Sequence, residues 1–133
     1  MYTVVKQIHF CYGHRLMNYD GQCRHPHGHN GRAEFEMSAE RLDARGMVTD
    51  FTDIKNAMKD WIDAEIDHKM LLRKDDPAVK VFGDMGEPVF VMDENPTAES
   101  ISKLFYDKAK SLGFPVRRVS VWETETSFAT YSG

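Results

Sequence analysis

Residues 31–40, with the sequence GRAEFEMSAE, are the clearest structural signal in the chain. Apolar and polar side chains alternate with a period of two, which is typical of a β-strand with one buried face. The apolar face comprises Ala33, Phe35, Met37 and Ala39, and the other face comprises Arg32, Glu34, Glu36, Ser38 and Glu40. A strand that is packed on one side and wet on the other predicts an antiparallel sheet.

The segments on either side of this strand continue the pattern. Residues 2–12 also alternate, with the side chains of Tyr2, Val4, Ile8, Phe10 and Tyr12 on one face, so we expect a second half-buried strand there. Residues 13–28 are rich in Gly, His and Asn and predict a loop. Residues 43–46 predict a turn, with Met47 and Val48 in a short strand leading out of it.

Two helices are predicted from apolar residues at helical spacing. Residues 50–66 carry one such stripe, with Asp50 as its N-cap. The second helix begins after Thr97, its expected cap, and ends before Gly113 and Pro115.

The remaining segments complete an α+β layout. We expect strands at residues 116–124 and 128–131, and a loop or short helix followed by a strand within residues 73–94. The chain is therefore expected to form a single domain over residues 1–133, an antiparallel sheet with two helices on one face.

Composition narrows the class of protein. The 133 residues carry a formal net charge of -4 with the signs interspersed, which argues against a nucleic-acid-binding surface. No segment is long and apolar enough to cross a membrane, and the N-terminus does not resemble a signal peptide. Only two cysteines are present, which favours a reducing, cytoplasmic location over a secreted disulfide scaffold.

Four of the six histidines lie between positions 14 and 29. If the strand of Phe35 extends back through Gly28, His27 and His29 share its inward face, and His14 shares the inward parity of the first strand. Three converging imidazoles predict a zinc site. His25 has the opposite parity and precedes Pro26, so we expect it in solvent, whereas His9 is expected to be an ordinary strand residue. Cys11 is expected to be a buried free thiol.

Cys23 has two interpretations. A structural zinc site normally has four protein ligands, and Cys23 would then be the fourth. A catalytic site keeps one position open, and Cys23 would instead be a thiol that reaches a metal-bound substrate from its polar loop.

Two further features are ambiguous from the residues alone. Asp67 beside His68 would orient the imidazole, or His68 would simply suit the C-terminal end of the first helix. Glu123 shares a strand face with Val119 and Val121, which indicates either a carboxylate awaiting a ligand or a strand end that turns back to solvent.

Six segments together resemble the 6-pyruvoyltetrahydropterin synthase family, which includes the bacterial 6-carboxytetrahydropterin synthases. They are GHRL at 13–16, CxxxHGHN at 23–30, MVTDFTDIK at 47–55, IDHK at 66–69, NPTAE at 95–99 and WET at 122–124. The resemblance implies the T-fold (tunnelling fold), a homohexamer built as a dimer of trimers, and active sites at subunit interfaces.

The resemblance also assigns roles to residues. It implies that zinc binds His14, His27 and His29, that Cys23 moves protons, and that Asp67 and His68 assist it. Glu123 matches the carboxylate that anchors the pterin ring, and Thr97 and Glu99 lie in a segment that borders the pterin pocket. Residues 73–94 look longer than in compact bacterial members, which bears on specificity for the substrate tail. Arg15 and Arg24 are candidates for contacts with the triphosphate.

The implied activity is that of a zinc-dependent lyase acting on 7,8-dihydroneopterin triphosphate. Its product would be 6-carboxy-5,6,7,8-tetrahydropterin, with loss of acetaldehyde and triphosphate, in the queuosine pathway. One alternative is a 6-pyruvoyltetrahydropterin synthase, which only eliminates triphosphate. Others are a non-catalytic zinc- and pterin-binding module and a zinc hydrolase of the same fold.

Overall fold

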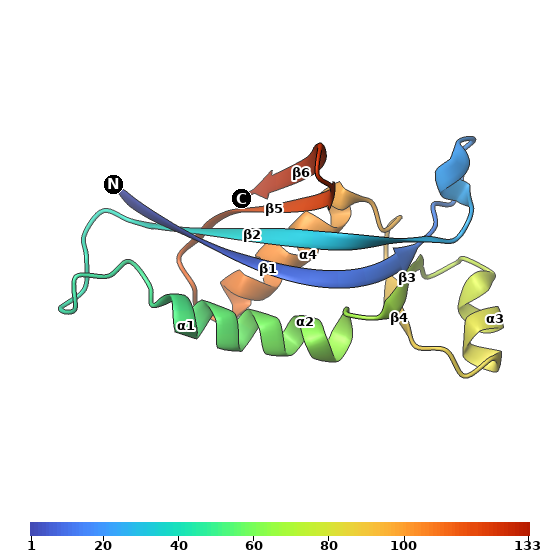
Figure 1. The fold of residues 1–133 in the computed structure, drawn as a ribbon, viewed down its shortest axis with the longest axis horizontal. Coiled ribbons are helices and arrows are strands. Elements are labelled where there is room, and N and C mark those ends of the chain that lie inside the picture. Colours follow the sequence, from blue (N-terminus) through green and yellow to red (C-terminus); the bar gives the residue numbers. More distant parts are fainter.

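Two long strands form the centre of the molecule. The computed structural model describes residues 1–133, and in it β1 (Tyr2–His14) pairs antiparallel with β2 (His27–Ala39) over their whole length. Both strands sweep across the molecule in Figure 1. The inward-facing extension to His14 and back to His27 is therefore confirmed, because His14 lies directly opposite His27 in the last pair of the ladder.

The sheet has six strands in the order β4-β3-β1-β2-β5-β6. On one side, β5 (Val116–Thr124) and β6 (Ser127–Ser132) continue the antiparallel pairing. On the other side, β3 (Lys69–Arg73) and β4 (Val89–Met92) are added in parallel. The α+β class is confirmed, but the sheet is mixed rather than antiparallel throughout.

β3 was not predicted from the sequence. Its Leu71 and Leu72 are both fully buried, so the strand lacks the alternation by which the other strands were recognised. A strand covered on both faces is a short apolar run, which periodicity alone cannot distinguish from a buried helix.

Met47 and Val48 do not form the expected short strand. The Asp43 carboxylate accepts hydrogen bonds from the backbone N–H groups of Arg45, at 2.8 Å, and Met47, at 3.0 Å. The Asp43 N–H in turn donates to the Met47 carbonyl at 2.9 Å. The backbone groups of this segment therefore form hydrogen bonds within the turn itself, and not with a neighbouring strand.

The first helical segment runs through α1 (Phe51–Ile54), a π-helical turn (Lys55–Lys59) and α2 (Asp60–Glu65). The Asp50 carboxylate accepts from the Thr52 N–H at 2.8 Å, which confirms the predicted cap. Within residues 73–94 the structure has α3 (Ala78–Asp84) followed by β4, as expected. The last helix, α4 (Ala98–Ser111), ends before Gly113, whose φ of +88° suits glycine.

Both long helical segments pack against the same face of the sheet. The Phe105 ring of α4 lies 5.4 Å from that of Phe10 and 6.1 Å from that of Phe35, centroid to centroid. It also meets the Trp61 ring of α2 edge-on at 5.7 Å. The prediction that both helices cover one face of the sheet is confirmed. The hydrophobic core lies between that face and the helices. No helix combines the length and apolar composition that a membrane crossing requires.

Candidate functional site

Three imidazoles meet where β1 and β2 begin to separate. The pairing sets His14 opposite His27 and Tyr12 opposite His29, so all three histidines point to the helix-covered face. Their ring centroids lie 4.5 to 5.0 Å apart, and one nitrogen from each gathers within 4.8 Å of the others. Ligand nitrogens around a tetrahedral zinc ion lie about 3.3 Å apart, given zinc–nitrogen bonds of about 2.0–2.1 Å. Side-chain adjustment of about an ångström would close this set around an ion.

Backbone carbonyls fix which nitrogens face the centre of the cluster. His14 Nδ1 donates to the Pro96 carbonyl at 2.7 Å, and His27 Nδ1 donates to the His25 carbonyl, also at 2.7 Å. A carbonyl only accepts, so both Nε2 atoms carry lone pairs, and they face each other at 3.0 Å. His29 Nε2 is buried without any partner. Lone pairs that converge without a donor fit a bound cation.

Burial favours the uncharged form of two imidazoles in the cluster. Burial lowers the pKa of His14 to about 4, the Pro96 carbonyl opposes this effect, and the neighbouring imidazoles add to it. Burial also lowers the pKa of His29. Both rings are therefore neutral at pH 7, which is the form that coordinates a metal.

Glu123 lies at the edge of the cluster. Its Oε1 is 3.9 Å from His14 Nε2, its side chain is 28% exposed, and the protein gives it no hydrogen-bond donor. Val119 and Val121 on the same face are fully buried. The carboxylate thus ends an apolar strand face beside the imidazoles, with its oxygens available to a ligand.

Tyr12 is a site residue that the sequence-based analysis placed only in the core. Its ring packs 5.1 Å from that of His14 and 5.6 Å from that of His29, and its Oη is buried without a partner. Burial, and then the charge of Glu123, raise the pKa of Tyr12, so the phenol keeps its proton. The available signal was parity, because Tyr12 precedes His14 by two residues on the same face.

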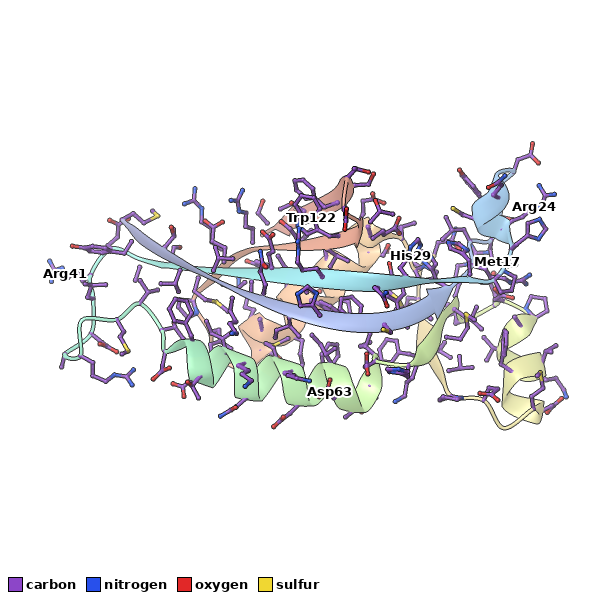
Figure 2. The ribbon with its side chains drawn as sticks, in the orientation of Figure 1. Met17, Arg24, His29, Arg41, Asp63 and Trp122 are labelled. Carbon is purple, nitrogen blue, oxygen red and sulfur yellow. The ribbon has the colours of Figure 1, made fainter.

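Cys23 lies in the loop that joins β1 to β2. It is half-buried in a 3₁₀ turn (Gln22–Arg24), and its carbonyl accepts from the Leu16 N–H at 2.9 Å. Its thiol is not among the atoms that gather with the three imidazoles, so the structure does not support Cys23 as a fourth metal ligand. His25 is exposed, as expected, and His9 is an exposed residue of β1, in keeping with its expected place in a strand. Figure 2 shows Met17 and Arg24 of this loop at the same end of the molecule as His29.

Asp67 and His68 form the expected pair at the start of β3. Asp67 Oδ2 accepts from His68 Nδ1 at 2.6 Å, and Oδ1 accepts from the Cys11 N–H at 2.8 Å. Burial alone would raise the pKa of Asp67, but these donors outweigh it and leave the pKa below its usual range. The His68 ring is 78% exposed, on a backbone with φ of +60°.

His68 lines a cavity of about 750 Å³ together with Cys11, Asn30 and Met70, and His27 and His29 of the cluster also contribute to its lining. In the strands, the side chains of Cys11, Asn30 and Met70 alternate with those of Tyr12, His29 and Leu71, so these three side chains lie on the face away from the helices. Cys11 is therefore not the buried free thiol that we expected from the sequence. It is half-buried, and its Sγ donates to Asn30 Oδ1 at 3.0 Å.

Comparison with known proteins identifies the family. Residues 3–133 match the family model described as 6-pyruvoyl tetrahydropterin synthase. The chain belongs to this family. It is 34% identical to a 6-carboxy-5,6,7,8-tetrahydropterin synthase of Rickettsia typhi, over 96% of this chain and 98% of that protein. It is also 29% identical to the 6-pyruvoyl tetrahydrobiopterin synthase of Homo sapiens, over 98% of this chain and 90% of that protein.

A solved structure supports the same fold. The 6-pyruvoyl tetrahydropterin synthase of Caenorhabditis elegans superimposes with a TM-score of 0.75 over 99% of this chain and 95% of that one, at 24% identity. The family predicted from the six motifs and its T-fold are thus confirmed.

In this member of the 6-pyruvoyl tetrahydropterin synthase family, the predicted site residues fall into two groups. The three histidines and Glu123 meet on the helix-covered face, and the Cys23 loop starts beside them at His14. Asp67 and His68 form their pair beside Cys11, and His68 lines the cavity, which also reaches His27 and His29. Cys23 does not line this cavity, and no hydrogen bond joins its thiol to Asp67 or His68 within the chain.

The remaining candidate residues differ in the contacts that they already make within the protein. Thr97 caps α4 by accepting from the Ser100 N–H at 3.1 Å, whereas Glu99 is exposed and makes no hydrogen bond. Arg15 forms an ion pair with the buried Asp76, which occupies its Nε and Nη2 groups. Arg24 stays 52% exposed.

Proposed function

We propose that this chain is a zinc-dependent 6-carboxytetrahydropterin synthase. It would convert 7,8-dihydroneopterin triphosphate to 6-carboxy-5,6,7,8-tetrahydropterin with loss of acetaldehyde and triphosphate. The observation that carries the proposal is the cluster of three converging imidazoles with a donor-free carboxylate at its edge. The bacterial relative described above bears the name of this activity, which favours it over the 6-pyruvoyl branch.

His14, His27 and His29 would hold the zinc ion, each through a nitrogen that faces the cluster. Bound zinc supplies Lewis-acid polarisation of the substrate's side-chain hydroxyls, which makes neighbouring C–H and O–H protons easier to remove. Glu123 would accept hydrogen bonds from the 2-amino group and N3–H of the pterin. This contact satisfies a carboxylate that has no donor in the protein and fixes the ring for proton transfer.

Cys23 would take and return the side-chain protons as general base and general acid. Asp67 orients and supports His68, and His68 would assist the thiol. Because Cys23 does not line the cavity that His68 lines, a second copy of the chain would supply Asp67 and His68. This separation supports a homo-oligomer with sites between subunits, which we propose to be a homohexamer built from two trimers.

The test is to incubate the zinc-loaded protein with 7,8-dihydroneopterin triphosphate and to identify the products by mass spectrometry. We expect 6-carboxytetrahydropterin together with acetaldehyde. 6-Pyruvoyltetrahydropterin with triphosphate release alone would reassign the chain to the branch named for its human relative. Pterin binding without turnover by the zinc-loaded, folded protein would contradict the enzyme assignment and favour a binding module.

A further inference from the structure

Three consecutive residues after the first histidine of the cluster are each held by a different contact. Arg15 is the first. Its Nε donates to Asp76 Oδ2 at 2.7 Å, and its Nη2 donates to Asp76 Oδ1. The Asp76 side chain has no exposed surface, and its Oδ1 also accepts from the Ala78 N–H at 2.8 Å. One buried carboxylate thus joins the start of the Cys23 loop to the start of α3.

Met17 is held from another direction. Its N–H donates to Asn95 Oδ1 at 2.8 Å, and its carbonyl accepts from Asn95 Nδ2, also at 2.8 Å. Asn95 is followed by Pro96, whose carbonyl accepts from His14 Nδ1. The same two residues therefore fix both a histidine of the cluster and the loop that leaves it.

Leu16 lies between these two anchors and makes the connection to the thiol residue. Its N–H donates to the Cys23 carbonyl at 2.9 Å, across the neck of the loop. Because the residues on both sides of Leu16 are fixed, the orientation of the Leu16 N–H is fixed as well. The hydrogen bond from this N–H then fixes the position of the Cys23 backbone. Met17 appears in Figure 2 beside the strand end that carries the histidines.

We propose that Asp76 and Asn95 are positioning residues that hold the Cys23 thiol at a fixed place relative to the histidine cluster. The proposal rests on the proposed function for the role of Cys23. Misplacing a reacting group by about 1 Å costs about 100-fold in rate, so a loop carrying a catalytic thiol needs fixed anchors. We call the side-chain contacts of Asp76 with Arg15 and of Asn95 with Met17 the frame of this loop. A buried ion pair often contributes little net stability, so stability alone is a weak reason for one at this neck.

The variants that test the frame are Asn95→Ala, which removes both bonds to Met17, and Asp76→Asn, which removes the charge opposite Arg15. Asn95→Asp is the conservative variant, because it keeps the acceptor for the Met17 N–H. Asp75→Asn is the matched control: Asp75 is 60% exposed, pairs with Arg73, and makes no contact with the loop. If Asp76→Asn fails to fold, the half-buried Asn95 carries the test.

Three readouts separate positioning from general stability. The first is hydrogen exchange of the Leu16 amide, which we expect to quicken by about 10-fold or more in Asn95→Ala and Asp76→Asn while amides of β1 and β2 keep their protection. The second is turnover, where we expect kcat to fall by about 10-fold or more with KM within about 3-fold. The third is alkylation of Cys23 by iodoacetamide, quantified on its own peptide, which we expect to quicken severalfold as the loop loosens.

Asn95→Asp should recover part of each effect, and Asp75→Asn should behave as wild type. Unchanged Leu16 exchange in Asn95→Ala would overturn the proposal, as would faster exchange with unchanged kcat. If the wild type shows no turnover on the assigned substrate, the substrate assignment fails separately. Hydrogen exchange and alkylation would then still test whether Asp76 and Asn95 hold the loop in place. An unchanged alkylation rate in the variants would overturn the proposal.

Discussion

The phenol of Tyr12 is a buried donor without a partner at the centre of the candidate site. A buried unsatisfied donor destabilises a protein by about 1–3 kcal/mol. Tyr12→Phe removes the hydroxyl and keeps the ring that packs against His14 and His29. We therefore expect the metal-free variant to be as stable as wild type or up to about 1 kcal/mol more stable in urea denaturation. A loss of more than about 1 kcal/mol would instead show that the hydroxyl has a partner in solution, such as ordered water.

The two interpretations of Cys23 differ in what its removal does to the metal. The thiol lies outside the group of converging nitrogens, so Cys23→Ala should keep one zinc per chain and bind pterin as wild type does. Turnover should fall by about 100- to 10,000-fold, the usual contribution of a general acid–base group. Metal analysis and product assays check this, with His25→Ala as the loop control, since that side chain is exposed. Loss of zinc from Cys23→Ala would restore the structural-site interpretation.

At the scale of elements, the cap of α4 has a role that does not depend on any ligand. Thr97 Oγ1 accepts from the Ser100 N–H, so Thr97→Ala should lower the free energy of unfolding by about 1 kcal/mol. Thr97→Ser keeps the oxygen and should lose less than half of that. Denaturation of the metal-free variants measures the cap, and pterin titration of the same pair reports separately on a binding role. Equal stability of Thr97→Ala and wild type would show that the cap contributes nothing.

The link between the Cys23 loop and α3 predicts a pH dependence. Burial alone would raise the pKa of Asp76, but the Arg15 guanidinium and the Ala78 N–H outweigh it and lower the pKa, while nearby Asp75 opposes them weakly. The stabilisation by this carboxylate is therefore complete above its unfolded pKa of about 3.9. It is lost as the pH falls through the lower folded value. The difference in unfolding free energy between wild type and Asp76→Asn should be constant from about pH 7 to 5 and shrink below about pH 4. A difference that grows toward acid pH would contradict this assignment.

Strands with one solvent-exposed face were predictable from the sequence, because their apolar and polar residues alternate. Strands that are buried on both faces were not predictable in this way. The parity of residues 31–40 extended back to His27 and His29 and so predicted which imidazoles would converge. The same rule failed for β3, where Leu71 and Leu72 are both buried. Cys11 was expected to be a buried thiol because free cysteines usually are, but its odd parity places it on the opposite face of the sheet, where it lines a cavity.

For the molecule as a whole, the motifs identified the family, but no local pattern showed that the proposed site is divided. Asp67 and His68 are adjacent in sequence, and their pairing was predictable. Their place beside Cys11 depends on the parallel addition of β3 beside β1, which was not foreseen. The frame formed by Asp76 and Asn95 was equally hidden, since it joins residues 61 and 78 positions apart.

Division of the site between copies predicts complementation. If each site takes Cys23 from one chain and His68 from another, homogeneous Cys23→Ala and His68→Ala proteins should both be nearly inactive. Random mixed oligomers of the two should recover about one quarter of wild-type activity, because half of the chains keep each group and a site needs one of each. Co-expression with two different tags and sequential purification isolates the mixed oligomers for assay. Cys23→Ala mixed with His27→Ala is the matched control and should stay inactive, since the chain that keeps Cys23 then lacks a ligand. Mixed oligomers of the first pair that are no more active than their parents would show that one chain supplies the whole relay.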